Sequence, residues 1–254
     1  MKLYSFILFL MMSSISYSFA ADNPLKAVVL AEEPWGFYDE SGGIDGVTVS
    51  YFKHLSKFLD EPIEVVLVPR QRLLRGMKKG TYDLTITFQD YLSEEFATPL
   101  EPTIMLDKML VGLKALDIKS KEDIEGLRLA IVRGASTGSW VDQNKAIKKI
   151  ETANFTEALW LLKKGRVDVV TGTEQVIHAS LPKVGMTTGD IGTPYFLSCK
   201  HVLLMLSNAS PNFSKKVKIK NAARELRHSP EWDALLEDAK TIAPDLIHDF
   251  NNHN

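Results

Sequence analysis

The chain has 254 residues, of which 45% are hydrophobic and 24% are charged, the composition of an ordinary globular protein. This length is enough for one large domain or for two small ones. The formal net charge of −2 argues against a nucleic-acid-binding protein, because such proteins usually carry a strongly basic face.

The first twenty residues have the features of a cleaved secretion signal. Lys2 supplies a positive charge, residues 3–12 are almost wholly apolar, and Ser18 and Ala20 place small side chains before a cleavage site after Ala20. The alternative is a membrane anchor, but the apolar run is shorter than the roughly 20 residues that span a bilayer. We therefore expect an exported, soluble, monomeric protein, without an internal disulfide because Cys199 is the sole cysteine.

Strand and helix patterns alternate in the first part of the mature chain. We predict strands at 27–31, 63–68 and 84–88 and helices at 47–59 and 71–79, the second of which ends at Gly80. This βαβαβ order favours a parallel sheet with right-handed crossovers.

A second unit repeats the pattern. We predict a short helix at 120–125, strands at 128–132 and 167–171, helices at 140–147 and 155–164, and a helical turn at 174–180. The segments LLRGMKKGTYDLTIT and ALWLLKKGRVDVVTG each join a helix, a Lys-Lys-Gly stop and an Asp that opens a buried strand. Shared βαβ patterning and internal duplication both explain this likeness, and either gives two α/β units.

Two β-segments link the units. Residues 103–115 lead out of the first unit and 195–207 lead back, before helices at 213–227 and 230–239. We accordingly divide the chain into a signal peptide at 1–20, lobe one at 21–107, lobe two at 108–195, and a hinge return with C-terminal helices packed on lobe one at 196–254. Two lobes joined by two strands form a hinged clamshell, and the cleft between them is the expected ligand site.

The loop at 133–138 carries the clearest local signal for a ligand. An apolar strand breaks there into Arg133, Gly134 and a pair of hydroxyl residues, Ser136 and Thr137, just before the helix predicted at 140–147. Free N–H groups and hydroxyls at the positive end of a helix dipole bind anions. We expect Ser136 and Thr137 to contact the ligand, with helix capping as the alternative role for one of them.

With these segments in place, the sequence resembles the extracellular solute-binding proteins of family 3, the amino-acid type of periplasmic binding protein. The resemblance rests on the segments EEPWGFYDESGGIDGVTVSYFKHLSKFL, LLRGMKKGTYDLTIT, GLRLAIVRGAST and LLKKGRVDVVTG, which span nearly all of the mature chain. It implies the two-lobed type II binding-protein fold, in which each lobe is a mostly parallel α/β sheet. It also implies a periplasmic location, a small-molecule solute, an inner-membrane ABC permease as partner, and no cofactor.

Two charged groups that the family uses to hold an amino acid are missing at the matching positions. Phe96 stands where the resemblance places the arginine for the α-carboxylate, and Gly172 stands where it places the aspartate for the α-amino group. A carboxylate–arginine pair is among the strongest polar contacts available to such a site. Its loss indicates either a ligand other than a standard α-amino acid or a grip by other residues.

The ligand contacts that we predict follow from four arguments. Aromatic residues of the first loop can stack on a ligand, and arginines near the cleft can replace the carboxylate clamp. Polar side chains at strand ends face the ligand in α/β units, and the hydroxyl loop binds anions. The predicted contacts are Trp35, Phe37, Arg72, Thr87, Gln89, Arg133, Ser136, Thr137, Thr173 and Glu174.

Three classes of function remain open. A solute-binding protein for an importer is favoured, and a sensing module for a membrane receptor has the same sequence features. An enzyme of the dehydratase type on this fold would need a carboxylic acid of raised pKa, for which Glu33 and Glu174 are the candidates. The six histidines lack zinc-ligand spacing and no nucleophile motif occurs, so we expect neither a metal site nor an enzyme.

Overall fold

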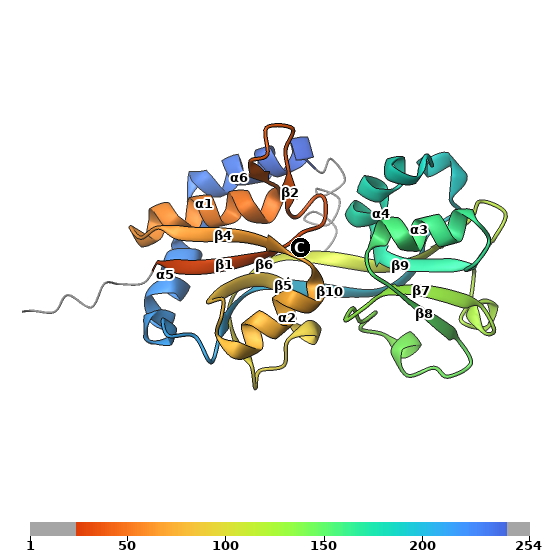
Figure 1. Cartoon of the computed structure of the whole chain (residues 1–254), viewed down its shortest axis with the longest axis horizontal. Coiled ribbons are helices and arrows are strands. Elements are labelled where there is room, and N and C mark those ends of the chain that lie inside the picture. Colours follow the sequence, from red (N-terminus) through yellow and green to blue (C-terminus); the bar gives the residue numbers. More distant parts are fainter. Residues whose placement is uncertain (1–23, 243–254) are drawn as a thin grey trace, which may run out of the picture.

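In the computed structural model of the protein, the structure is described for residues 24–242, and the predicted signal peptide lies outside these residues. Two α/β lobes lie side by side and are linked by long strands (Figure 1). Within residues 24–242, no helix has the length and apolar character needed to cross a membrane.

Lobe one is a parallel sheet between two layers of helices. Its strands are β1 (Leu25–Leu30), β4 (Ile63–Val68) and β5 (Leu84–Phe88), with β1 in the centre. Helices α1 (Val47–Leu59), α5 (Lys216–Arg227) and α6 (Pro230–Ile242) cover one face, and α2 (Arg70–Lys79) covers the other. A short hairpin, β2 (Phe37–Tyr38) with β3 (Ile44–Asp45), precedes α1.

The alternation of side chains along β1 explains this layering. Ala27 and Val29 pack into the core beneath α1, α5 and α6, whereas Val28 packs against α2. Successive residues of a strand point to opposite faces, so an uninterrupted apolar strand is buried on both sides.

Lobe two has a smaller sheet. Strand β7 (Arg128–Val132) lies between β8 (Lys148–Thr152) and β9 (Val169–Thr173) and pairs in parallel with both. Helices α3 (Phe155–Lys163) and α4 (Glu174–Ser180) pack on one face. Irregular segments cover the other face with the buried side chains of Ile118, Ile124, Val141 and Ile147.

Strands β6 (Ala97–Gly112) and β10 (Tyr195–Ser207) run antiparallel through both lobes. β10 pairs with β5 in lobe one and β6 pairs with β9 in lobe two, which gives one eight-stranded sheet of order β4-β1-β5-β10-β6-β9-β7-β8. The predicted two-lobed fold with two linking strands is therefore confirmed. The lobe boundaries predicted at 107/108 and 195/196 fall inside β6 and at the first residue of β10.

Most predicted elements occur close to their predicted positions, but the helix predicted at 140–147 is absent. Trp140–Asp142 form a single 3-10 turn, and the chain then enters β8, a strand that we did not predict. The side chain of Asp142 folds back onto the preceding loop, where Gly134 and Gly138 have positive φ angles of 80° and 62°. Short polar side chains that hydrogen-bond nearby backbone compete with helix formation in this way.

Candidate functional site

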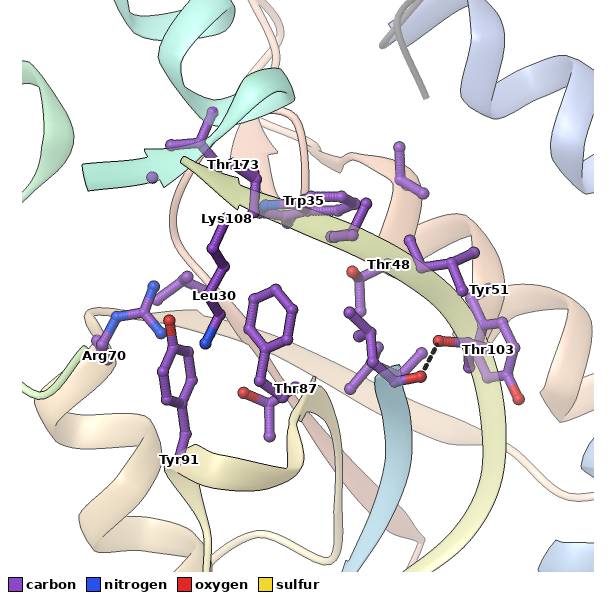
Figure 2. Close-up of a pocket in the computed structure, with 18 of the residues that line it drawn as sticks. Leu30, Trp35, Thr48, Tyr51, Arg70, Thr87, Tyr91, Thr103, Lys108 and Thr173 are labelled. Carbon is purple, nitrogen blue, oxygen red and sulfur yellow. Dashed lines mark hydrogen bonds between the residues drawn. The ribbon is translucent and has the colours of Figure 1, made fainter. Parts of the chain in front are cut away.

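A cavity of about 100 Å³ lies where the two lobes meet the linking strands. Its walls include Leu30 at the end of β1, the start of α2, and residues 171–173 of β9. The end of β5 and the turn after it contribute Ile86, Thr87, Phe88 and Tyr91. The linking strands contribute Ile104, Leu106, Lys108 and Val202, and α6 closes one end. Figure 2 shows Arg70, Tyr91 and Lys108 gathered on one side of the cavity and Thr48, Tyr51 and Thr103 on the opposite side.

Lys108 is a buried cation at the polar end of the cavity. Its side chain is 3% exposed, and Nζ lies 2.9 Å from Asp90 Oδ2 and donates a hydrogen bond of 3.0 Å to the carbonyl of Ser136. Nζ also lies 4.2 Å from the ring centre of Phe88 and 4.6 Å from that of Tyr91. Burial lowers the pKa of Lys108, and the hydrogen bond and charge of Asp90 oppose that effect.

Arg70 is the first residue of α2, and its side chain turns into the cavity. The guanidinium lies 4.7 Å from the ring centre of Tyr91 and 4.0 Å from the Glu32 carboxylate. The side chain is only 10% exposed, and Nε is buried without a hydrogen-bond partner. A buried donor without a partner costs about 1–3 kcal/mol, so a ligand that accepted a hydrogen bond from Arg70 Nε would remove this cost.

Glu32 joins the two lobes behind Arg70. Its Oε1 accepts a hydrogen bond of 3.2 Å from the backbone N–H of Phe155, at the start of α3 in lobe two. Burial raises the pKa of Glu32, against the lowering effects of the Arg70 charge and of this hydrogen bond. The carboxylate thus faces a helix N-terminus and a guanidinium, two groups that favour its charged form.

Thr173 supplies a second unused polar group. It ends β9, it is 6% exposed, and its Oγ1 is buried without a hydrogen-bond partner. Thr173 and Arg70 approach the same cavity from lobe two and lobe one respectively. A ligand that contacts both groups would bridge the lobes.

The loop at 134–138 does bind an anion, but that anion belongs to the chain. Asp142 Oδ1 accepts hydrogen bonds of 2.9 Å from Thr137 N and from Thr137 Oγ1, and Oδ2 accepts from Ser136 Oγ at 2.7 Å and from Gly138 N at 2.9 Å. Since no helix follows the loop, the expected helix dipole is missing. Burial acts to raise the pKa of Asp142, but these hydrogen bonds outweigh it and lower the pKa below the ordinary 3.8.

Four of the ten predicted contacts line the cavity. They are Trp35, Thr87, Ser136 and Thr173. Trp35 packs against the lobe-two core and against the apolar cluster at the linking strands, so it lies between the lobes as expected for a residue that covers a ligand.

The other six predicted contacts do not line the cavity, and each has a structural role or an exposed position. Phe37 pairs with Asp45 in the β2–β3 hairpin, and Arg72 is exposed on α2. Gln89 donates to Glu94, and Arg133 pairs with Glu151 at 3.0 Å. Thr137 is fully buried beside Asp142, and Glu174 lies 4.0 Å from His178.

Phe96 and Gly172 are the two positions at which the resemblance implied that charged ligand-binding groups are missing. Phe96 lies outside the cavity with Lys78 above its ring at 4.4 Å, and the charged residue beside the cleft after β5 is Asp90. Gly172 does line the cavity, but a Cβ atom there would lie 2.7 Å from the ring of Phe155. No larger side chain fits at Gly172 unless Phe155 moves.

Sequence reasoning considered Arg70 and Arg72 at the start of α2 and chose Arg72, and it missed Tyr91 and Lys108. For Arg70 a signal was present, because the buried apolar side chains of α2, Leu73 and Met77, lie three and seven positions after it. The helical period therefore puts Arg70 on the inner face and Arg72 on the outer face. Lys108 is a charged residue within an otherwise mostly apolar strand, which is the pattern of a buried functional cation.

We compared the sequence and the fold of this chain with those of known proteins. No family model matches the chain. The probable amino-acid-binding protein YxeM of Bacillus subtilis is 24% identical over 225 residues, which cover 85% of this chain and 83% of that protein.

Two solved structures share the architecture. A mutant of ArgBP from T. maritima superposes with a TM-score of 0.71 at 22% identity and covers 86% of this chain and 95% of its own. A histidine kinase sensor domain with similarity to periplasmic binding proteins gives a TM-score of 0.74 at 13% identity and covers 87% of this chain and 96% of its own. The protein therefore has the periplasmic binding protein fold. Its similarity to a probable amino-acid-binding protein agrees with the resemblance noted in the sequence.

Proposed function

We propose that this protein captures a small solute, an amino acid or a related compound, between its lobes and delivers it to an ABC importer outside the cytoplasmic membrane. The observation that carries the proposal is the cavity between the lobes, which is lined by Arg70 of lobe one and Thr173 of lobe two, with Arg70 Nε and Thr173 Oγ1 both buried without hydrogen-bond partners. The relation to a probable amino-acid-binding protein supports the same role.

Capture requires that the lobes open and close. Closure brings Glu33 of lobe one within 3.0 Å of Lys183 of lobe two, and Glu32 into contact with the backbone N–H of Phe155. The polar end of the cavity is walled by both lobes, so a solute enters when they part and is enclosed when they meet. Hinge closure of this kind is a common binding motion in two-lobed proteins.

A thermal-shift panel of amino acids and small carboxylates tests the proposal, because a ligand that binds the folded state raises the melting temperature. Arg70→Gln should weaken binding of any hit by about 2 kcal/mol or more, roughly thirtyfold, because it removes a buried charged contact. Arg72→Gln is the matched control, since Arg72 is exposed on the same helix and does not line the cavity. Equal effects of the two changes, or no hit in the panel, would contradict the proposal.

A sensing role is the second candidate, and the match to a histidine kinase sensor domain favours it. Both roles use the same ligand cleft and differ in the membrane partner. Permease and ATPase genes beside the gene for this chain would support import, and a receptor gene there would support sensing.

An enzyme is not favoured. The described residues that line the cavity include no Asp or Glu to act as a general acid. Of the two candidates, Glu33 is paired with Lys183, and Glu174 lies beside His178 outside the lining. The matching relative is described as a binding protein.

A further inference from the structure

We propose that the preferred ligand is a short apolar carboxylate without an amino group, held by its carboxylate at Arg70 and by its tail in an apolar arm of the cavity. This inference rests on the proposed function and narrows its ligand class. It follows from the charges around the cavity and from the shape of its far end.

The charges that face the ligand have one sign. Arg70 and Lys108 line the cavity, whereas no acidic side chain does so among residues 24–242. Asp90 and Glu32 lie behind the two cations and pair with them at 2.9 Å and 4.0 Å. A ligand carboxylate would therefore meet Arg70 Nε and the Lys108 ammonium.

An α-ammonium group, by contrast, has no counter-charge in the cavity. It would lie within a few ångströms of the ligand's own carboxylate and hence close to Arg70 and Lys108. Thr173 Oγ1 is the unused acceptor that remains, and it is neutral. Since an unpaired buried charge is costly, the cavity discriminates against the amino group of a standard amino acid.

Away from Arg70 the cavity has mostly apolar side chains beside the hydroxyl residues Thr48, Tyr51 and Thr103. We call the apolar part the apolar arm, and its side chains are Ile104, Leu106, Val202, Leu235 and Ala239. Leu106, Val202 and Ala239 are buried together and pack with Ile104. Among the hydroxyl groups in this part, Thr103 Oγ1 donates a hydrogen bond of 2.8 Å to the Val202 carbonyl. The arm therefore offers dispersion contacts and no charge, which suits an alkyl or aryl tail and not a guanidinium or imidazolium.

The size of the cavity limits the tail. The whole cavity measures about 100 Å³, so it favours a small ligand. The tail is thus a few carbon atoms long. Propanoate, butanoate, pentanoate and 4-methylpentanoate form a suitable series.

The test is calorimetric titration of the exhaustively dialysed protein with that series, with leucine and with arginine. Each added methylene should strengthen binding about fourfold until the arm is full. We expect 4-methylpentanoate to bind at least about tenfold more tightly than leucine, which differs by the amino group. Arginine should bind more weakly than both.

Two variants on α6 locate the tail. Ala239→Leu fills the arm and should weaken the binding of 4-methylpentanoate by about tenfold or more, while the affinity for propanoate should change little. Ala234→Leu makes the same change at an exposed position of the same helix and should leave both affinities unchanged. Circular dichroism and the retained affinity for propanoate show that Ala239→Leu is folded, and Ala239→Gly is a second variant that leaves the arm open.

The outcomes separate this inference from the proposed function. Tighter binding of leucine or arginine than of the carboxylates, with dependence on Arg70, would overturn the inference and leave the proposed function standing. Absence of chain-length dependence, or equal effects of the two Ala→Leu changes, would also overturn the inference. Failure of every ligand to bind would overturn both.

Discussion

At the scale of single residues, the chain itself supplies an ammonium group, on Lys108, and a carboxylate, on Asp142, which are the two charged groups of an amino acid. The Lys108 ammonium is surrounded by a carboxylate, a carbonyl and two aromatic rings. The Asp142 carboxylate receives four hydrogen bonds from the loop at 136–138. Because the chain itself provides partners for Lys108 and Asp142, the cavity-lining groups left without a hydrogen-bond partner are Arg70 Nε and Thr173 Oγ1, and Lys108 adds its positive charge to the site.

Asp142 should stabilise the fold in a pH-dependent manner. Asp142→Asn should lower the free energy of unfolding at neutral pH by about 1–3 kcal/mol, because the loop donors lose a charged acceptor. The folded pKa lies below the unfolded value, so this contribution is present above about pH 4 and is lost as the pH falls through the folded pKa. Urea unfolding at several pH values measures it.

The control for this experiment is Asp117→Asn. Asp117 forms an exposed ion pair with Lys119, and such pairs contribute little to stability because solvent screens them. A gap between wild type and Asp142→Asn that stays constant down to acidic pH would contradict the assignment, as would an effect no larger than that of Asp117→Asn.

At the scale of elements, the two glycines that follow α2 and α3 show how far local sequence determines structure. The Lys-Lys-Gly segments were predicted to end two helices, and Gly80 and Gly165 both adopt left-handed conformations, with φ of 69° and 64°. Their surroundings differ. A Cβ atom on Gly80 would lie 2.0 Å from the Ala209 carbonyl oxygen, whereas one on Gly165 would meet nothing within 4 Å.

We therefore expect unequal costs for the same substitution. Gly165→Ala should destabilise the protein by about 1–2 kcal/mol, the cost of a left-handed conformation for a residue with a Cβ atom. Gly80→Ala should cost about 1–3 kcal/mol more, because the backbone of residue 209 must also move. Urea unfolding of both variants measures the difference, and equal values would show that Ala209 does not pack on α2 as described.

The absent helix at 140–147 shows where local sequence reasoning failed. The buried side chains of Val141 and Ile147 lie on the lobe-two core, but they reach it from a 3-10 turn and an irregular segment. The deciding contact is that of the Asp142 side chain with the loop before it. Helical periodicity cannot register such a contact, because it depends on the turn that Gly134 and Gly138 permit.

At the scale of the whole molecule, the two-lobed arrangement follows from the βαβ patterns and the two linking strands, which is why it could be predicted, whereas the order of strands in the sheet was not predicted. The composition of the cavity could not be predicted, because its walls come from residues far apart in sequence, such as Arg70, Lys108 and Trp232. Arg72 and Arg133 carry the right chemistry but point elsewhere. Only the packing of the lobes decides which arginine meets the ligand.

The most direct test of the account is a crystal structure of the protein with its tightest ligand from the calorimetric series. The account predicts ligand density enclosed between the lobes, with a polar group within hydrogen-bond distance of Arg70 Nε or Thr173 Oγ1. Ligand density outside this cavity, or a ligand bound between the lobes without contact to either residue, would contradict it.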